Sequence, residues 1–347
     1  MPKPKKKVNH TITMRDVAKA ANVSQSTVSR ILAPSSSLSK VPISEETTKK
    51  VLQVVKDLGY HPNQYARSLR GKKSQMIGML IADISNPFYH PMVRAVQDVA
   101  SQYHYSVMIA NSDHLREKEE LFCESVIRRP VDGAIIIPYH LTDDDLDNLM
   151  TRTGMVISAL GNHIQHPEID VTFADDTKAS YEAVQWLIKE KGHQRIGFIC
   201  ANMDFPVSAR RYGAFQKAMQ ESALLVPDEY VICGDWSVDN GRRAITKLLQ
   251  LPEPPTAVFA ASDTIAIGAL EGAIELNFHV PEDIAIIGFD DIPAAKWVQP
   301  HLTTVSQFPG EMGALMAKAL FERIMGEYTG TRRLYEVPCK FIEREST

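Results

Sequence analysis

Short apolar segments alternate with amphipathic segments through most of the chain, and this alternation restricts the fold more than any other feature. Residues 77–82, 105–111 and 133–138 are short apolar runs, whereas residues 92–103 and 117–127 carry apolar side chains at helical spacing. Strands that alternate with helices of about 10–15 residues form parallel sheets, because parallel neighbours need a long crossover connection. The alternation therefore predicts an α/β fold.

The same pattern occurs a second time further along the chain. The segment Ile196–Cys200 resembles Ile77–Ile81, which lies 119 residues earlier, and residues 256–261 correspond to residues 134–137 at a similar separation. Two α/β units of related plan are therefore expected. A cleft between two such units is a usual location for a ligand.

Charge divides the chain into two unlike parts. Residues 1–75 contain 15 Lys and Arg against 4 Asp and Glu, a net charge of +11, whereas residues 76–347 have a net charge of −15. The total of −4 hides this division. Such asymmetry suggests a basic module for nucleic acid or membrane, joined to an acidic body.

The basic part contains three short helical patterns. Thr13 caps the first, and Asn22, which tolerates a left-handed conformation, ends it. Ser24 caps a second helix that follows almost at once, and a third begins at Ser44 and stops at Gly59. Two helices of about eight residues joined by a tight turn form a helix-turn-helix.

Polar residues at the start of the second helix suit contacts with DNA. Gln25, Ser26 and Arg30 match base edges, since Gln pairs with adenine, Arg with guanine and Ser with either. The hydroxyl residues Thr13, Thr27 and Ser29 suit phosphate contacts, and Ser24 is a further DNA-binding candidate. Short three-helix units also serve as protein-binding modules, but the charge of +11 favours DNA because affinity comes largely from phosphate neutralisation.

The order of these residues resembles that of a known family. Residues 13–30, TMRDVAKAANVSQSTVSR, closely resemble the DNA-binding headpiece of the LacI/GalR family of bacterial transcription regulators. Residues 59–71, GYHPNQYARSLRG, resemble the hinge helix that links the family's headpiece to its body. The resemblance implies that Gln25, Ser26 and Arg30 lie in the major groove.

The resemblance also implies a role for the linker. Residues 63–70 would fold into a helix when two copies meet on the minor groove, where Asn63, Ala66 and Leu69 would contact DNA and Leu69 would act as an apolar wedge. Packing of Leu69 on its own body is the alternative. Residues 33–43 form a connection about five residues longer than the usual family loop, and the basic tail 1–12 is an extra feature that adds phosphate contacts or stays solvated.

The acidic body resembles the effector-binding region of the same family, which is itself similar to periplasmic sugar-binding proteins. The matching phrases include DISNPF at 83–88, GHQRIG at 192–197 and PTAVFAASD at 255–263. The resemblance implies two Rossmann-like subdomains with parallel sheets and three crossings, near Ala174, Ser306 and Gly326. The expected domains are a tail (1–12), a headpiece (13–60), a hinge (61–75) and a body (76–347), the body comprising an N-subdomain (76–174 and 306–326) and a C-subdomain (175–305 and 327–347).

Candidate effector-binding residues follow from position within this resemblance. They are Asp83, Phe88, Tyr89, Asp175, Arg211, Trp236, Ser262 and Asp290. Such a set suits a sugar, because a carboxylate accepts from paired hydroxyls, Arg donates through a rigid fork, and aromatic faces cover the apolar face of a pyranose. The alternatives are core packing for Phe88 and Trp236 and a salt bridge for Arg211 and Asp290. Ser262 stands where relatives often have Asn.

Other classes of protein are disfavoured. The sequence has no G-x-G-x-x-G after a strand, no phosphate loop and no nucleophile with a base, so we expect neither an enzyme nor a cofactor. His163 and His166 lack further ligands, so no metal site is expected. The four cysteines are scattered, which predicts reduced, buried thiols. The apolar runs fall far short of about 18 residues, so a cytoplasmic location without membrane contact is expected.

The sequence as a whole predicts a homodimeric transcriptional repressor that binds a pseudo-palindromic double-stranded operator. A small molecule, a sugar by the residues above, would bind between the two α/β subdomains and control operator affinity allosterically. A solute-binding transport component and a sugar-processing enzyme are the alternatives. The missing export signal and the basic headpiece oppose the first, and the missing catalytic constellation opposes the second.

Overall fold

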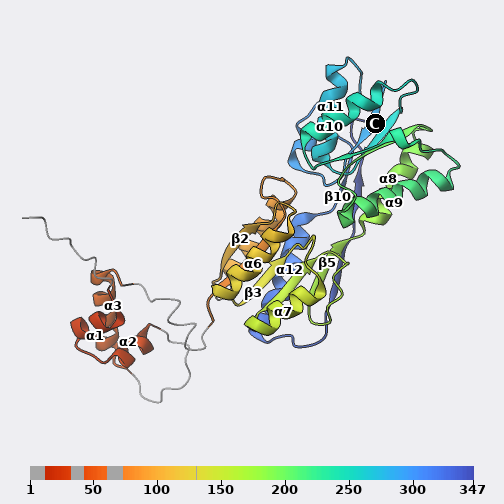
Figure 1. The fold of residues 1–347 in the computed structure, drawn as a ribbon. Helices are drawn as coiled ribbons and strands as arrows, with labels where there is room; N and C mark the ends of the chain where they lie inside the picture. The colour runs from red at the N-terminus through yellow and green to blue at the C-terminus, as the bar shows by residue number, and fades with distance from the viewer. Residues whose placement is uncertain (1–11, 33–42, 61–72, 130) are drawn as a thin grey trace, which may run out of the picture. The chain divides into compact units, whose positions relative to one another are not determined.

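The computed structural model describes residues 12–32, 43–60, 73–129 and 131–347 (Figure 1). The chain forms two compact units, Met1–Ser74 and Gln75–Thr347. Several predicted features lie outside the described residues: nearly all of the basic tail, most of the 33–43 connection, and the hinge residues Asn63, Ala66 and Leu69.

The first unit holds three helices, α1 (Met14–Ala21), α2 (Gln25–Ile31) and α3 (Glu45–Leu58). Local chemistry sets their ends: Ser24 and Ser44 each accept the backbone N–H of the residue three positions later, and Asn22 and Gly59 are left-handed. A small core lies between the helices and contains Val17, Ala18, Ala21, Val28, Val51 and Tyr60. The predicted helix-turn-helix is confirmed.

The second unit begins with an α/β layer that we call the N-subdomain. All strands of its six-stranded sheet pair in parallel, in the order β11-β5-β4-β3-β1-β2. The strands are β1 (Met76–Ile81), β2 (Ser106–Asn111), β3 (Gly133–Ile136), β4 (Val156–Leu160), β5 (Asp170–Ala174) and β11 (Leu334–Val337). The helices are α5 (Tyr89–Gln102), α6 (Arg116–Arg128), α7 (Asp143–Thr153) and α12 (Pro309–Met325).

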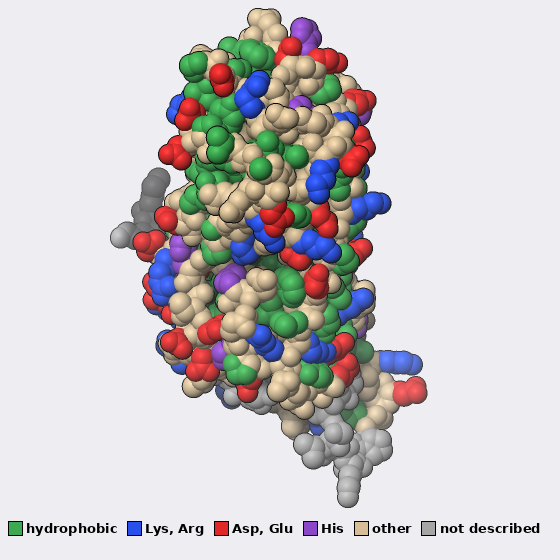
Figure 2. All heavy atoms as spheres, turned by 90° about the vertical axis from the view of Figure 1, so that its right-hand side faces the viewer, with side chains coloured by type: hydrophobic (Ala, Val, Ile, Leu, Met, Phe, Trp, Pro, Cys, Tyr) green, Lys and Arg blue, Asp and Glu red, His purple; other side chains and the backbone are tan. Residues whose placement is uncertain are grey.

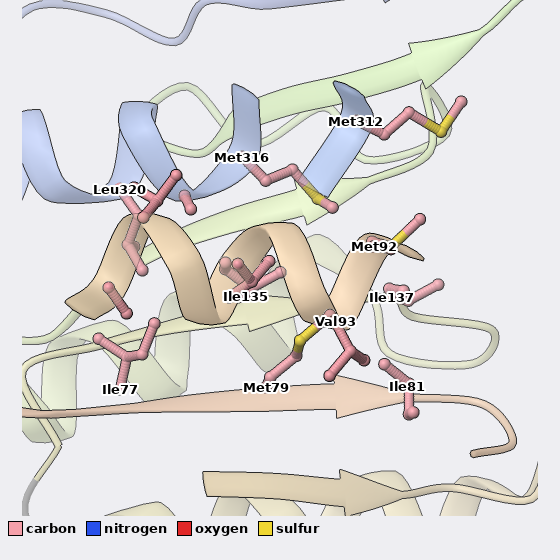
Figure 3. Packing of buried hydrophobic residues seen from close by; sticks show 14 of the residues in the cluster. Ile77, Met79, Ile81, Met92, Val93, Ile135, Ile137, Met312, Met316 and Leu320 are labelled. Atoms are coloured by element: carbon pink, nitrogen blue, oxygen red, sulfur yellow. The ribbon is translucent and has the colours of Figure 1, made fainter. Parts of the chain in front are cut away.

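Two apolar layers hold the N-subdomain together. On one face of the sheet, Met92 of α5 and Met316 of α12 pack with Met79 and Ile135 of the strands, as Figure 3 shows. On the other face, α6 and α7 supply apolar side chains to a second cluster, with Phe122 among them. Strands buried on both faces need continuous apolar runs, which is the pattern in the sequence.

The C-subdomain repeats this plan with a four-stranded parallel sheet in the order β7-β6-β8-β9. Its strands are β6 (Ile196–Ala201), β7 (Val231–Gly234), β8 (Ala257–Ala260) and β9 (Ala285–Ile287). Helices α8 (Asp176–Lys189) and α9 (Pro206–Glu221) cover one face, and α10 (Val238–Leu249) and α11 (Asp263–Glu275) cover the other (Figure 1). An antiparallel pair, β10 (Thr304–Ser306) and β12 (Lys340–Ile342), completes the subdomain. The predicted α/β body with two parallel sheets is confirmed.

The chain crosses between the two subdomains three times, and the third crossing corrects our prediction. The first two connect β5 to α8 and β10 to α12. We expected the third near Gly326, with residues 327–347 in the C-subdomain. Instead β11 pairs with β5, with Leu334 opposite Val171, so the crossing follows Val337. Gly326 ends α12 in a left-handed conformation with φ of 76°, and the chain returns along the N-subdomain sheet.

Two of the four cysteines also depart from the prediction of reduced thiols. Cys200 and Cys233 form a disulfide, with their Cα atoms 4.6 Å apart. The reason is register, because the two residues lie opposite each other on the neighbouring strands β6 and β7. Cys123 and Cys339 are free thiols.

No helix among the described residues is both long and apolar enough to span a membrane.

Candidate functional site

The predicted DNA-reading residues lie at the start of α2. Gln25 and Ser26 are exposed, while Val28 of the same helix is buried in the core of the unit. Arg30 lies about one turn further on and is half-buried. The apolar side of α2 therefore packs in the core, and the polar residues of its first turn face outward.

The hydroxyl residues beside them also shape the helix ends. Ser24 accepts the backbone N–H of Thr27 at 3.1 Å, and its hydroxyl lies 2.7 Å from that of Ser26 and 2.8 Å from that of Thr27. Thr13 donates its hydroxyl to Asp16 at 2.6 Å in a capping box. Both residues remain exposed, so capping leaves their outer surfaces open.

A cavity lies between the N- and C-subdomains and encloses about 860 Å³ of empty space, including the part open to solvent. The residues that line it are Asn86, Phe88, Tyr89, His114, Ile137, Pro138, Tyr139, Leu160, Gly161, Asn162, His163, Phe173, Ala174, Asp176, Pro206, Val207, Arg210, Arg211, Trp236, Asp290, Gln307 and Met312.

Five of the eight residues predicted from position line this cavity: Phe88, Tyr89, Arg211, Trp236 and Asp290. The other three are used in local turns and caps and are not among the lining residues. Asp83 accepts the backbone N–H and the hydroxyl of Ser85, Asp175 accepts the backbone N–H of Lys178 at the start of α8, and Ser262 accepts that of Ile265 at the start of α11.

Sequence reasoning missed several polar lining residues, namely Asn86, His114, Tyr139, Asn162, His163, Asp176, Arg210 and Gln307. A topological signal was available for two of them. His114 and Tyr139 follow β2 and β3, and the carboxyl ends of parallel strands are where ligands bind in open α/β sheets. Asp176 adjoins the predicted Asp175, so the prediction is one position off there, whereas Arg210 lines the cavity together with its predicted neighbour Arg211.

The charged lining residues form one network. Asp176 accepts two hydrogen bonds from Arg210, at 2.9 and 3.0 Å. The Arg211 guanidinium lies between the two carboxylates, with Nε 3.6 Å from Asp176 and Nη1 3.8 Å from Asp290. Arg211 is 3% exposed, and a charge so deeply buried requires such partners.

Arg211 is held by two further contacts. Its Nη1 donates to the carbonyl of Ala261, and its guanidinium lies over the Phe289 ring, 3.8 Å from the centroid. Asp290 is held in turn by Gln307, whose side-chain amide donates to it at 2.6 Å. Because Gln307 follows β10 at the second crossing and Asp176 follows β5 at the first, the network lies where the subdomains join.

The turn that carries Asp290 has an unusual backbone. Asp290 and Asp291 have φ of 120° and 54°, which non-glycine residues seldom adopt. Asp263 of α11 supports this turn by accepting the backbone N–H of Ile292 at 2.8 Å and the hydroxyl of Thr304. The buried side chain of Asp263 therefore stabilises the conformation that presents Asp290 to the cavity.

Burial changes the pKa of several lining groups. It raises the pKa of Asp290 to about 7, although Arg211 and Gln307 act in the opposite direction. It lowers the pKa of His114 and of His163 below the ordinary value for an imidazole. The hydroxyls of Tyr89 and Tyr139 lie 3.3 Å apart, and burial raises the pKa of each.

Three buried nitrogens at the cavity have no hydrogen-bond partner within the described protein: Arg211 Nε, Trp236 Nε1 and His114 Nδ1. They come from α9, from the loop before α10 and from the loop after β2. Buried polar atoms are normally paired, so these three are suited to a bound molecule or water.

Two family models match the chain. One, described as bacterial regulatory proteins of the lacI family, matches residues 13–63. The other, described as a periplasmic binding protein-like domain, matches residues 187–347.

Relatives match nearly the whole chain. The catabolite control protein A of Priestia megaterium is 34% identical over 97% of this chain and 99% of its own length. The ribose operon repressor of Halalkalibacterium halodurans is 35% identical over 96% of this chain and 97% of its own length. The transcriptional repressor CytR of Escherichia coli strain K12 is 32% identical over 99% of this chain and 98% of its own length.

Solved structures agree with these relatives. The Lac repressor bound to ONPG in the repressed state has a TM-score of 0.82 and 26% identity, over 97% of this chain and 99% of that one. The complex of the transcriptional regulator CelR with cellobiose has a TM-score of 0.70 and 27% identity, over 97% of this chain and 100% of that one. The relatives are transcription regulators and not enzymes, which confirms the prediction that no enzyme would be found. The chain belongs to the lacI family of bacterial regulatory proteins.

Proposed function

We propose that this protein is a homodimeric repressor whose affinity for a pseudo-palindromic operator is set by a small molecule in the cavity between its subdomains. The observation that carries the proposal is the combination of an outward-facing polar first turn on α2 with a polar and aromatic cavity at the subdomain crossings. A dimer is part of the proposal, because two-fold symmetric regulators of this kind bind two half-sites.

Charge supports DNA binding through the first unit and hinge. The net charge of +11 lies in residues 1–75, and residues 76–347 carry −15. On the face that Figure 2 shows, acidic and basic side chains of the described residues are interspersed rather than grouped by sign. A surface of that kind does not attract phosphate, so phosphate neutralisation is expected from the basic segment.

The lining residues and the ligands of related structures support a carbohydrate as the effector. Aromatic side chains of Phe88, Phe173 and Trp236 line the cavity together with Asp290 and Arg211. A CelR structure contains cellobiose, and a LacI-family structure from Enterococcus faecium, 28% identical with a TM-score of 0.70 over 78% of this chain and 98% of that one, contains ribose. A sugar ring offers an apolar face to aromatic rings and hydroxyls to the charged pair.

Control of DNA affinity would act through the crossings. A ligand that contacts Asp176, Asp290 or Gln307 contacts residues beside the first two crossings, so it favours one relative orientation of the subdomains. That ligand changes operator affinity only by its differential affinity for the two orientations. The hinge between the two units would transmit the change to the headpiece.

The test of DNA recognition is a pair of matched glutamine variants. An operator is selected from random duplexes with the full-length protein, and binding is measured by fluorescence anisotropy. Gln25→Ala should weaken operator binding by about 10- to 100-fold, the loss of one bidentate base contact, with the slope of affinity against salt unchanged because no charge is removed. Gln53→Ala removes an exposed glutamine from α3 and should have no effect. Equal effects of the two variants would contradict the proposed base contact.

A further inference from the structure

The disulfide between Cys200 and Cys233 joins a buried strand to an edge strand of the C-subdomain. β7 stands at one end of the order β7-β6-β8-β9, so among the described residues it has a paired strand on one side alone. Cys200 is 0% exposed, whereas Cys233, which lies opposite it in the register, is exposed. A dissolved thiol can therefore approach the bond from the side of Cys233.

We propose that Cys200 and Cys233 form a site of reversible thiol–disulfide exchange, and that opening the bond loosens one wall of the cavity between the subdomains. The co-reactant is a small dithiol or a glutathione-type thiol. A repressor works beside DNA, in a compartment where thiols are kept reduced and disulfides are usually transient or redox-sensing. In this respect the inference rests on the proposed function, while the exchange itself rests on the geometry of the two cysteines.

The exchange balances with the co-reactant alone. A thiolate of the co-reactant attacks Sγ of Cys233, the bond to Sγ of Cys200 breaks, and Cys200 leaves as a thiolate that takes up a proton. A second thiolate then attacks the co-reactant sulfur of this mixed disulfide, and Cys233 leaves and is protonated in the same way. Two electrons pass to the cysteines and the co-reactant becomes a disulfide. Oxidation is the reverse reaction, with glutathione disulfide as the electron acceptor.

Contacts that involve no sulfur hold the two strand ends together in both states. The side-chain amide of Asn240 donates to the carbonyl of Cys200 at 3.1 Å and to that of Asp235 at 2.7 Å. Gly234 makes room for this amide, because a Cβ at that position would overlap the Asn240 oxygen. The β6–β7 ladder also runs over several residues besides the cysteine pair. Opening the bond should therefore leave the fold intact.

The loops that leave the two bonded strands meet again at the cavity. Trp236 lies three positions after Cys233 and lines the cavity, and the loop after Cys200 leads to the lining residue Pro206. The rings of Phe205 and Trp236 stack, with centroids 6.5 Å apart and an interplanar angle of 14°. The disulfide thus closes a ring of contacts whose far side is a wall of the cavity.

The bond restricts a side chain that little else holds. Trp236 Nε1 is buried and has no hydrogen-bond partner within the described protein. When the bond is closed, the end of β7 is tied to β6 three positions before Trp236. When it is open, the indole has more freedom, which a ligand must remove at a cost in affinity. The oxidised protein should therefore present the more ordered cavity.

The two remaining cysteines provide internal controls. Cys123 and Cys339 are half-buried free thiols. Burial raises the pKa of Cys123 to about 11 and that of Cys339 to about 12. Because the thiolate is the reactive form, neither thiol is suited to exchange at neutral pH.

The first experiment follows the bond in the folded, full-length protein. The protein is oxidised with glutathione disulfide, treated with dithiothreitol without denaturant, trapped with acid and alkylated in denaturant for peptide mass spectrometry. Cys200 and Cys233 should be unlabelled before reduction and labelled after it, with the far-ultraviolet circular dichroism unchanged, and glutathione disulfide should close the bond again. A bond that opens only in denaturant, an opening that abolishes the circular dichroism signal, or thiols that stay free after oxidation would each overturn the inference.

The second experiment measures the freedom of Trp236. Trp186→Phe combined with Trp297→Phe leaves Trp236 as the one tryptophan of the chain. The rate of acrylamide quenching, corrected for the fluorescence lifetime, should rise on reduction and fall again on oxidation. The difference between the wild type and Trp236→Phe gives a second measure of the same rate if the double variant folds poorly. Equal rates in the two redox states would contradict the coupling of the bond to the cavity.

Matched cysteine variants separate the bond from other effects of the reagents. Cys233→Ser should show the quenching rate of the reduced protein under both conditions, whereas Cys123→Ser, on α6, should behave as the wild type does. A redox response that persists in Cys233→Ser would overturn the inference. Operator binding is measured on the same preparations. Failure of the wild type to bind any operator would contradict the proposed function, whereas a bond that does not open, with operator binding intact, contradicts this inference alone.

Discussion

The carboxylate of Asp263 accepts the backbone N–H of Ile292 at 2.8 Å and thereby holds the turn in which Asp290 and Asp291 have positive φ. Burial raises the pKa of Asp263 to about 8, and the charge on Asp290 acts in the same direction. Asp263 is thus an acid that is easier to protonate in the folded protein than in the unfolded chain.

The raised pKa of Asp263 predicts how stability depends on pH. Below about pH 4 Asp263 is protonated in both the folded and the unfolded protein, so its titration does not lower the free energy of unfolding. As the pH rises from there to 8, the unfolded chain ionises first and the folded state loses stability. Asp263→Asn can accept from Ile292 and donate to Thr304, so it should be more stable than the wild type at pH 8 by at least about 1.4 kcal/mol, one pKa unit, and similar at pH 4.

Urea denaturation of Asp263→Asn at the two pH values measures this difference. Asp98→Asn, an exposed aspartate paired with Arg94 on α5, is the control and should show no such dependence. A constant difference between Asp263→Asn and the wild type across the pH range would show that Asp263 does not titrate between these values.

The pKa of Asp170 is shifted in the opposite direction, because the effect of its arginine partners on the pKa exceeds the effect of burial. Burial alone would raise its pKa, but hydrogen bonds from Arg323 at 2.7 and 2.8 Å and from Arg333 at 2.8 Å hold the pKa below 3.8. These contacts join β5 to α12 and to the chain that leads into β11. Asp170→Asn should destabilise the protein by about 3–5 kcal/mol, because two arginines lose a buried partner.

Denaturation at neutral pH measures the loss in Asp170→Asn. The stability that Asp170 contributes is present above the unfolded pKa and disappears as the pH falls through the lower folded pKa, so wild type and variant should converge only in strong acid. Asp144→Asn, which changes an exposed residue of α7, should leave stability unchanged. A loss below about 1 kcal/mol in Asp170→Asn would contradict a structural role for the pair.

The sequence predicted best those features that depend on neighbouring residues. Thr13, Ser24 and Ser44 begin helices through their own side chains, and Asn22 and Gly59 end helices through their own backbone. The buried strands of both sheets are equally predictable from the sequence, since strands covered on two faces must be apolar throughout. Both kinds of signal are local in the chain.

Features that depend on register or on distant partners could not be predicted. β11 is an edge strand in which only Val337 is buried, so it has no apolar run to mark it and the third crossing was misplaced. The Cys200–Cys233 disulfide follows from the register of β6 with β7. In the cavity, Asp175 caps its own helix and leaves Asp176 to pair with Arg210, a choice made by three-dimensional contacts.

Close contact between α10 and α11 gives a prediction about stability. A Cβ on Gly268 would overlap the carbonyl oxygen of Val238, and one on Gly241 would overlap that of Ile265, so the glycines let the two backbones touch. Gly268→Ala should therefore destabilise the protein by about 1–3 kcal/mol, the usual cost of overpacking. Gly213→Ala on α9 meets nothing within 4 Å and should stabilise it by about 0.5–1 kcal/mol. Thermal denaturation of both variants checks the pair, and similar shifts would contradict the close contact.

Glu119 positions one wall of the cavity from outside it. This buried carboxylate on α6 accepts the backbone N–H groups of Tyr139, His140 and Leu141 at 2.8, 3.0 and 2.9 Å, and Tyr139 lines the cavity. Glutamine has one acceptor oxygen instead of two and an amide that repels the remaining N–H. Glu119→Gln should therefore displace the loop and weaken the binding of an effector by about tenfold, 1.4 kcal/mol.

Calorimetry with an effector, alongside operator binding in its absence, tests the role of Glu119. Glu120→Gln is the matched control, because Glu120 is the next residue of α6, is exposed and pairs only with Arg116 among the described residues. Effector affinity should fall in Glu119→Gln alone, while operator affinity without effector stays the same in both variants because the headpiece is a separate unit. A parallel loss of operator affinity in Glu119→Gln would mean that the whole N-subdomain has been disturbed rather than one wall of the cavity.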